Sequence, residues 1–241
     1  GPPVSVNQGG VAATGDYLFF MDSDDVFAPN RLQLFLTAMK NQSADLCYGK
    51  KVKTHDLNEI QKHTTVTWES STNALNYMLK NNIMQMCVMC SKELFLKAGG
   101  CNEKIFIQDE SLALNLGKYS QKIISTDLHC VFVILDEEET TRVRGENRLS
   151  RHLEQQHYDM FFTIDDFLQN YPNIDQENKK ILIKKAFSTY WKSIKNTPQQ
   201  RFSDLLIYLA SKVSPIKMWD NNHQHLIEYF EKLDHVRKIR T

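Results

Sequence analysis

A short apolar segment that ends in acidic residues places the strongest constraint on how this chain folds. Residues 16–21 are rich in aromatic side chains and follow a glycine, which is the pattern of a buried β-strand. Asp22, Asp24 and Asp25 come directly after it, and a helix is predicted from Pro29 onward. In open α/β sheets, ligands bind outside the carboxyl ends of the strands. The three acids are therefore predicted to lie at a ligand-binding edge of a sheet.

The crowding of these carboxylates has two explanations. In the first, one or two of them form a turn that caps the following helix. In the second, all three bind a hard cation, because carboxylate oxygens suit Mg²⁺ or Mn²⁺, which take further ligands from substrate phosphates. We favour the cation site, since unpaired charge is costly at the end of a buried strand and a turn does not account for three acids.

The rest of the pattern divides the chain into an α/β half and a helical half. Strand patterns at 44–55, 84–91 and 122–137 alternate with helical patterns at 29–42, 71–80, 92–98 and 109–120. Four long helical patterns follow, at 150–171, 176–195, 198–212 and 221–239. We therefore predict two domains, residues 1–149 and 150–241.

The composition argues against several classes of protein. The 29 basic and 29 acidic side chains cancel, so no overall basic field attracts nucleic acid. No apolar run approaches the length that spans a bilayer, and residues 1–10 have no signal-peptide pattern. The five cysteines are an odd number in a long chain, which argues against a disulfide framework. Cys87 and Cys90 are accordingly predicted to be buried core thiols.

The acidic segment belongs to a longer string that resembles the family 2 glycosyltransferases of the GT-A fold. In that family, N-x-G-(I/L)-x-x-A-x-G-(E/D)-Y precedes an apolar strand, then D-x-D-D and a proline. The matching residues are Asn7, Gly9, Ala13, Gly15, Asp16, Tyr17, Asp22, Asp24, Asp25 and Pro29. The resemblance implies an α/β fold with a GT-A-like (Rossmann-like) mixed sheet and flanking helices, here followed by a mostly helical C-terminal region.

A second segment carries the same resemblance on the acceptor side. In the family, a helix ends in Gly-Gly, a loop follows, and E-D-x-x-L begins the next helix. The matching residues here are Gly99, Gly100, Asp109 and Leu112, with Gln108 in place of the family's glutamate. The resemblance implies that Asp109 is the general base of an inverting transfer, and that Gly99, Gly100 and Glu110 contact the acceptor. The residues alone leave a helix N-cap as the alternative role of Asp109.

The resemblance also implies a nucleotide-sugar donor and a Mn²⁺ or Mg²⁺ cofactor held by Asp22, Asp24 and Asp25. A basic loop at 142–152 would fold over the donor diphosphate, since guanidinium groups bind phosphate in a bidentate manner. A solvated basic linker is the alternative for this loop. The donor-binding residues implied are Asn7, Asp22, Ser23, Asp24, Arg144 and Ser150.

We therefore expect a metal-dependent, inverting glycosyltransferase of hexosyltransferase type that acts on a hydroxyl of a glycan or a lipid-linked saccharide, in the cytoplasm. The alternative is a non-catalytic module that binds carbohydrate or protein, derived from a truncated transferase domain. The family's N-terminal nucleotide-binding units are not visible before Asn7. Residues 2–6 look either like the family's first strand running directly into Asn7, or like a variant of the helix that precedes it.

The helical region contains a candidate membrane-binding helix. Residues 179–195 place Ile183, Phe187, Tyr190 and Ile194 on one helical face, with lysines elsewhere. One interpretation is an interfacial helix on anionic lipid, which would make the protein peripheral to the inner face of the membrane. The other, which we favour, is a helix packed on the α/β core with a solvated lysine face.

Two further patterns in the helical region concern acids and histidines. Asp165 and Asp166 are expected at an exposed helix edge. His223 and His225 flank a predicted helix start and are weak evidence for a metal site, because we expect no acids beside them.

Overall fold

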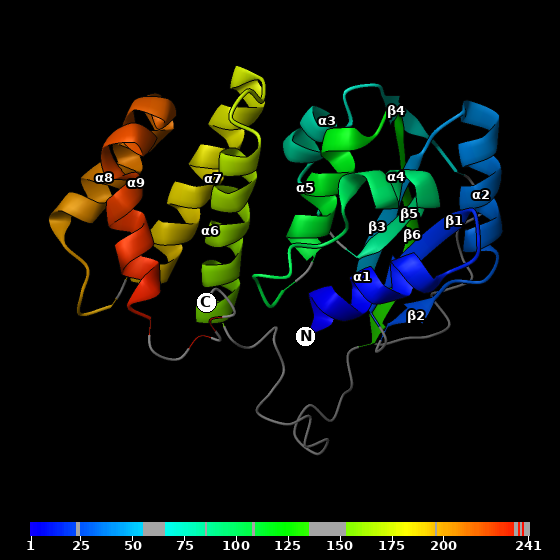
Figure 1. Cartoon of the computed structure of the whole chain (residues 1–241), viewed down its shortest axis with the longest axis horizontal. Coiled ribbons are helices and arrows are strands. Elements are labelled where there is room, and N and C mark those ends of the chain that lie inside the picture. Colours follow the sequence, from blue (N-terminus) through cyan, green and yellow to red (C-terminus); the bar gives the residue numbers. More distant parts are fainter. Residues whose placement is uncertain are drawn as a thin grey trace, which may run out of the picture. The chain divides into compact units, whose positions relative to one another are not determined.

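The computed structural model describes residues 1–22, 25–54, 66–84, 86–107, 109–134, 153–195, 197–233, 236 and 238. The chain divides into two compact units, which Figure 1 shows as a sheet with helices and as a set of long helices. The sheet unit comprises residues 4–101 and 112–145, and the helical unit comprises residues 1–3, 102–111 and 146–241. The predicted boundary between residues 149 and 150 lies outside the described residues.

The sheet unit is built on one mixed β-sheet. Its strands are β1 (Tyr17–Met21), β2 (Val26–Phe27), β3 (Leu46–Thr54), β4 (Glu69–Ser71), β5 (Cys87–Ser91) and β6 (Ile123–Ile134). The order across the sheet is β1-β5-β3-β6-β2, and β4 also pairs with β6. β3 and β6 run parallel, whereas the other pairs are antiparallel. The mixed sheet that the resemblance implied is confirmed.

Helices cover both sides of this sheet. They are α1 (Pro2–Ala12), α2 (Arg31–Gln42), α3 (Ala74–Asn81), α4 (Lys92–Ala98) and α5 (Asp109–Tyr119). In Figure 1, α2 lies on one side of the sheet, and α3 and α5 lie on the other. Phe35 and Met39 of α2 are buried against Cys47 and Ile124 of the sheet. The helix predicted from Pro29 starts at Arg31, after a left-handed residue.

β1 is a strand as predicted, but it is only partly buried. Among the described strands it pairs with β5 alone, so it forms an edge of the described sheet. Leu18 is buried, whereas Met21 is 37% exposed. The predicted burial of this strand is confirmed only for Leu18, because burial depends on the neighbours of a strand and the sequence pattern shows only the strand itself.

The N-terminal residues form a helix. α1 runs without a break from Pro2 through Asn7 to Ala12, so the first-strand interpretation of residues 2–6 was wrong and the helix variant is confirmed. Pro2 and Pro3 are compatible with this helix because the first turn does not need their missing N–H groups.

The helical unit consists of long helices with an aromatic core, as predicted for the C-terminal region. They are α6 (Leu153–Asn170), α7 (Gln176–Ile194), α8 (Phe202–Val213) and α9 (Pro215–Glu231). Phe161 of α6 stacks on Phe230 of α9, with ring centroids 4.5 Å apart. α9 begins at Pro215, earlier than the predicted residue 221, because proline fits the first turn of a helix.

The apolar face of α7 is inside the helical unit. Ile183, Phe187 and Tyr190 are fully buried and Ile194 nearly so, and the neighbours of α7 in its unit are α6, α8 and α9. The interfacial-helix interpretation of α7 was therefore wrong, because this apolar face is buried. The predicted burial is confirmed, but the neighbours that bury the face are helices of its own unit, whereas packing on the α/β core was predicted. None of the helices in the described ranges has the length and hydropathy needed to cross a membrane.

Two histidines of α9 lie beside buried acids. His223 Nε2 is 2.6 Å from Asp165 Oδ1, and His225 Nε2 is 3.8 Å from Asp204 Oδ1. Asp165 is only 2% exposed, so the expected exposed edge was wrong, as was the expected lack of acids near the histidines. These pairs connect α9 to α6 and α8 and thereby organise the helical unit.

Candidate functional site

The acidic end of β1 converges on a lysine of β3. Asp22 follows β1 and Asp25 precedes β2, and Asp25 N donates to Asp22 O at 3.2 Å. Lys51 Nζ lies 2.6 Å from an Oδ2 atom of each acid. The side chains of Lys51 and Asp25 are 19% and 3% exposed, so this bridge is largely shielded from water. Ser23 and Asp24 lie between the two acids, outside the described residues.

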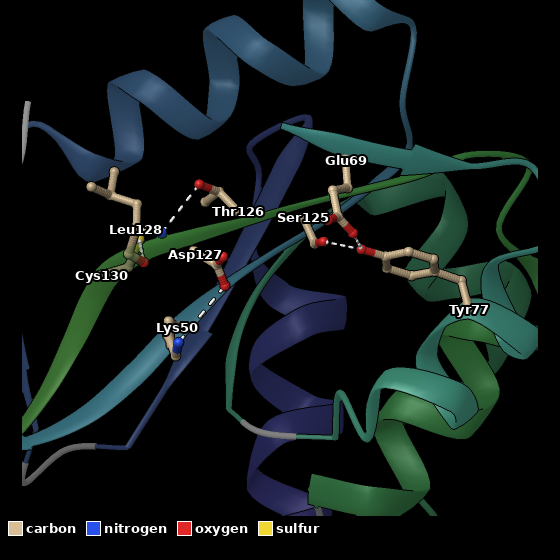
Figure 2. Close-up of polar contacts among 8 residues, drawn as sticks. All are labelled: Lys50, Glu69, Tyr77, Ser125, Thr126, Asp127, Leu128 and Cys130. Atoms are coloured by element: carbon tan, nitrogen blue, oxygen red, sulfur yellow. Dashed lines mark hydrogen bonds and ion pairs between the residues drawn. The ribbon is translucent and has the colours of Figure 1, made fainter. Parts of the chain in front are cut away.

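An irregularity in β3 gives two adjacent lysines different partners. The register of β3 against β6 shifts on both sides of Lys50. Figure 2 shows Lys50 directed at Asp127 of β6; the two charged groups are 3.7 Å apart and exposed. The next residue, Lys51, reaches the acids after β1. Successive side chains of a strand point to opposite faces, so only one of the two adjacent lysines reaches the acidic end of β1.

A hydrogen-bonded group secures the start of β6, the parallel partner of this strand (Figure 2). The Tyr77 hydroxyl donates to Glu69 Oε2 at 2.5 Å and lies 2.6 Å from Ser125 Oγ. Burial raises the pKa of the Tyr77 phenol, and the hydrogen bond to Glu69 raises it further. The neutral phenol thus links α3, β4 and β6, and the link supports the alignment of β3 with β6.

Lys51 is a permanent positive charge between the two acids. Burial alone would lower the pKa of Lys51, but its hydrogen bonds to Asp22 and Asp25 and their negative charges outweigh burial and raise that pKa well above its ordinary value. The ammonium group therefore offsets the repulsion between the carboxylates across the physiological pH range.

Asp22 and Asp25 supply the kind of oxygen ligand that a hard cation takes. An oxygen from each of Asp22 and Asp25 approaches one positively charged atom, and carboxylate oxygens are ligands that Mg²⁺ and Mn²⁺ prefer. Lys51 Nζ lies at this point, so a metal ion held by both acids must share them with the ammonium group or displace it. Within the described ranges, which do not include Asp24, no three His, Cys, Asp or Glu side chains are grouped as a metal site.

Asn7 connects α1 to the glycine pair after α4. Its Oδ1 accepts from Cys101 N at 2.7 Å, and its Nδ2 donates to Cys101 O at 3.0 Å. Gly99 and Gly100 have φ values of 78° and 71°, and a Cβ on Gly100 would overlap Asn7 Oδ1. The predicted helix end at Gly99 is confirmed. These contacts explain the three residues structurally, without any ligand.

The loop that carries the predicted base is held by two acids of α6. In residues 102–111, Asn102 Nδ2 donates to Asp166 Oδ2 at 2.7 Å, and Ile107 N donates to Asp159 Oδ2 at 2.9 Å. Asp159 is only 2% exposed, and burial raises its pKa to about 6. The acid thus anchors the loop through a backbone hydrogen bond two residues before Asp109.

Asp109 and Glu110 form the first turn of α5, where the helix dipole favours negative charge. Burial raises the pKa of Glu110, although the charge of Lys185 lowers it. Burial acts in the opposite direction on Lys185 and lowers the pKa of its ammonium group. Shifted pKa values around a partly buried carboxylate are typical of functional sites, and they make this turn a candidate for proton transfer.

Sequence reasoning missed Lys51 and Asp159. For Lys51 a signal was present, because a strand pattern with consecutive lysines places one of them on each face of a sheet. Asp159 lies within a helical pattern, which gave no sign that it would cap a distant loop.

All five cysteines are free and buried, which confirms the core role predicted for Cys87 and Cys90. Arg144 and Ser150 lie outside the described residues.

Comparison with known proteins connects this geometry to a family. Residues 1–97 match the family model described as Glycosyl transferase family 2. None of the curated proteins compared with the chain is a significant match. Crystal structures of S. aureus TarS 1-349, alone and in complex with UDP-GlcNAc, align with TM-scores of 0.55 at 11% identity and cover 88% of this chain.

The chain spans 59% of the length of the first of these structures and 60% of the second. At this identity the likeness concerns the fold alone, and it includes the mixed sheet with flanking helices and the helical C-terminal region. The resemblance to the family 2 glycosyltransferases is therefore confirmed over residues 1–97, in a chain that shares the fold of the TarS structures.

Proposed function

We propose that this chain transfers a sugar from a nucleotide-diphospho-sugar to a hydroxyl of a glycan or a lipid-linked saccharide, in a cation-dependent reaction that inverts the anomeric carbon. The observation that supports this most is the convergence of Asp22 and Asp25 at the end of β1, inside the segment that matches the family model. A TarS structure contains UDP-GlcNAc, so uridine diphosphate sugars are the first donors to test.

On the donor side, Asp22, Asp24 and Asp25 hold Mn²⁺ or Mg²⁺, which when bound supplies positive charge to the diphosphate leaving group. Lys51 holds the carboxylates of Asp22 and Asp25 close together before the donor arrives. Asn7, Ser23, Arg144 and Ser150 complete the proposed donor site, with Arg144 pairing with a phosphate group.

On the acceptor side, the Asp109 carboxylate takes the proton of the attacking hydroxyl. A single displacement at the anomeric carbon then inverts its configuration, because no protein group bonds to the sugar. Gly99, Gly100 and Glu110 contact the acceptor. Asp159 positions the loop through its hydrogen bond to the Ile107 amide.

The test is release of the nucleotide diphosphate from a panel of nucleotide-sugars, with Mn²⁺, with Mg²⁺ and with EDTA. We expect cation-dependent release by the wild type and a loss of at least a hundredfold in Asp24→Ala, of the order seen when an electrostatic stabiliser is removed. Asp127→Asn is the matched control, because this carboxylate belongs to the same unit and is 91% exposed. Equal activity in Asp24→Ala and the control would refute the proposed cation site.

The same assay separates the enzyme from a non-catalytic module. Asp109→Asn should keep donor binding, measured by isothermal titration, while transfer to an acceptor is lost. If the wild type binds saccharide but releases no nucleotide from any donor, the chain is a non-catalytic binding module.

A further inference from the structure

α8 presents a continuous row of apolar side chains to solvent. Phe202, Leu206, Leu209 and Val213 are 74%, 51%, 51% and 87% exposed. At about 100° per residue they lie within about 60° of arc, and they extend over about 16 Å of the helix. We call these four residues the α8 stripe. Soluble proteins rarely expose contiguous apolar surface of this kind unless it is an interaction site.

Polar contacts on the opposite face fix the orientation of α8. Asp204 and Ser211, which lie about 180° from the stripe, are almost completely buried. On that face, the Tyr190 hydroxyl of α7 donates to Asp204 Oδ1 at 2.7 Å. On the flank of α8, Lys212 Nζ donates to Ser188 Oγ at 2.8 Å. Rotating the stripe inward would break these contacts, so its exposure follows from the packing of the helical unit.

The ionised side chains that α8 and its N-cap expose have one sign. They are Arg201 and Lys212, and at about 100° per residue both lie about 90° from the stripe, on one flank of the helix. The single acid of α8, Asp204, is 2% exposed and directed into the unit. On α8 itself, the apolar row is therefore flanked by cationic side chains and by no exposed acid.

We propose that the α8 stripe docks this protein on an anionic lipid membrane. An exposed apolar helix face with lysine and arginine around it is the arrangement of helices that lie in the membrane interface. The apolar side chains enter the boundary of the acyl chains, and the cationic side chains meet the lipid phosphates. The positive charge that α8 exposes favours a lipid surface over a second copy of this chain, whose α8 would carry the same charge. The inference does not depend on the proposed transferase activity.

Co-sedimentation of the whole chain with lipid vesicles tests the inference. We expect binding to vesicles of phosphatidylcholine with phosphatidylglycerol, weaker binding at high salt, and little binding to phosphatidylcholine alone. The double variant Leu206→Asp/Leu209→Asp should reduce the bound fraction roughly tenfold or more. Leu96→Asp in α4 is the matched control, because Leu96 is also 51% exposed, and it should bind like the wild type.

If the double variant loses the helical circular dichroism signal and so does not fold, Val213→Asp near the end of α8 is the second variant. Val213→Asp should also weaken vesicle binding. The inference is overturned if the wild type does not bind anionic vesicles, or if the stripe variants bind as well as Leu96→Asp. It is equally overturned if sedimentation velocity shows that the stripe holds a dimer that does not bind vesicles.

Discussion

Replacing Lys51 by methionine should destabilise the protein and make its stability depend strongly on divalent cations. The substitution keeps most of the apolar volume but removes the charge 2.6 Å from both Asp22 and Asp25. Breaking a fully buried ion pair costs about 3–5 kcal/mol. Asp25 is 3% exposed but Asp22 is 30% exposed, so we expect a loss of about 2–3 kcal/mol in EDTA, or roughly 4–12 °C in the unfolding midpoint.

A divalent cation should restore the stability of Lys51→Met. If the two carboxylates bind Mn²⁺, saturation at about 100 times Kd contributes about 2.7 kcal/mol, which is close to the expected loss. The wild type should gain less, because the ammonium group competes for the same oxygens. Thermal unfolding in EDTA and in MnCl₂ measures both effects.

Lys50→Met is the control for this experiment. Lys50 is the adjacent residue, and its partner Asp127 is 3.7 Å away and 91% exposed, so its removal should change the stability by less than about 0.5 kcal/mol. The prediction is wrong if Lys51→Met and Lys50→Met have the same unfolding midpoint in EDTA, or if Mn²⁺ stabilises Lys51→Met no more than the wild type.

Other predictions concern the loop bonded to Asp159 and the glycine turn after α4. The folded pKa of Asp159 is raised from 3.8 to about 6, so its contribution to stability is fully present below about pH 4 and is lost as the pH rises through about 6. In urea unfolding at a series of pH values, this effect should lower the free energy of unfolding of the wild type by about 3 kcal/mol, and Asp159→Asn should lack it. If the free energies of unfolding of the two proteins change with pH in parallel, the prediction is wrong. Gly100→Ala should lower the free energy of unfolding by about 1–3 kcal/mol, because its φ is 71° and the new methyl group meets Asn7. Gly9→Ala, in the interior of α1 with nothing within 4 Å of the new Cβ, should instead raise it by about 0.5–1 kcal/mol; equal effects at both glycines would refute this account of the turn.

The features that follow from local patterns were predictable. The strand before Asp22, the helix that ends at Gly99 and the long C-terminal helices all result from hydrophobic periodicity and from the left-handed preference of glycine. The sequence also indicated where the acids would be, since they follow a strand directly. The mixed sheet came from the family resemblance, because periodicity does not reveal which strands pair.

The features that depend on distant neighbours were not predictable. The strand pattern with consecutive lysines marked Lys51 as a residue of one sheet face, but its contact with Asp22 and Asp25 depends on where β3 lies in the sheet, which has no local sequence signal. Asp159 anchors a loop about fifty positions earlier in the chain, which a helical pattern cannot show. β2 and β4 are two and three residues long, too short for any periodicity to mark them.

The proposed function requires that the acids at the end of β1 hold a divalent cation for a nucleotide diphosphate. Electron paramagnetic resonance measures this property as the binding of Mn²⁺ with and without UDP. We predict that UDP tightens Mn²⁺ binding to the wild type and that Asp22→Asn abolishes this effect, whereas Asp127→Asn retains it. Mn²⁺ binding that is absent from the wild type, or that is the same in all three proteins, would contradict the claim.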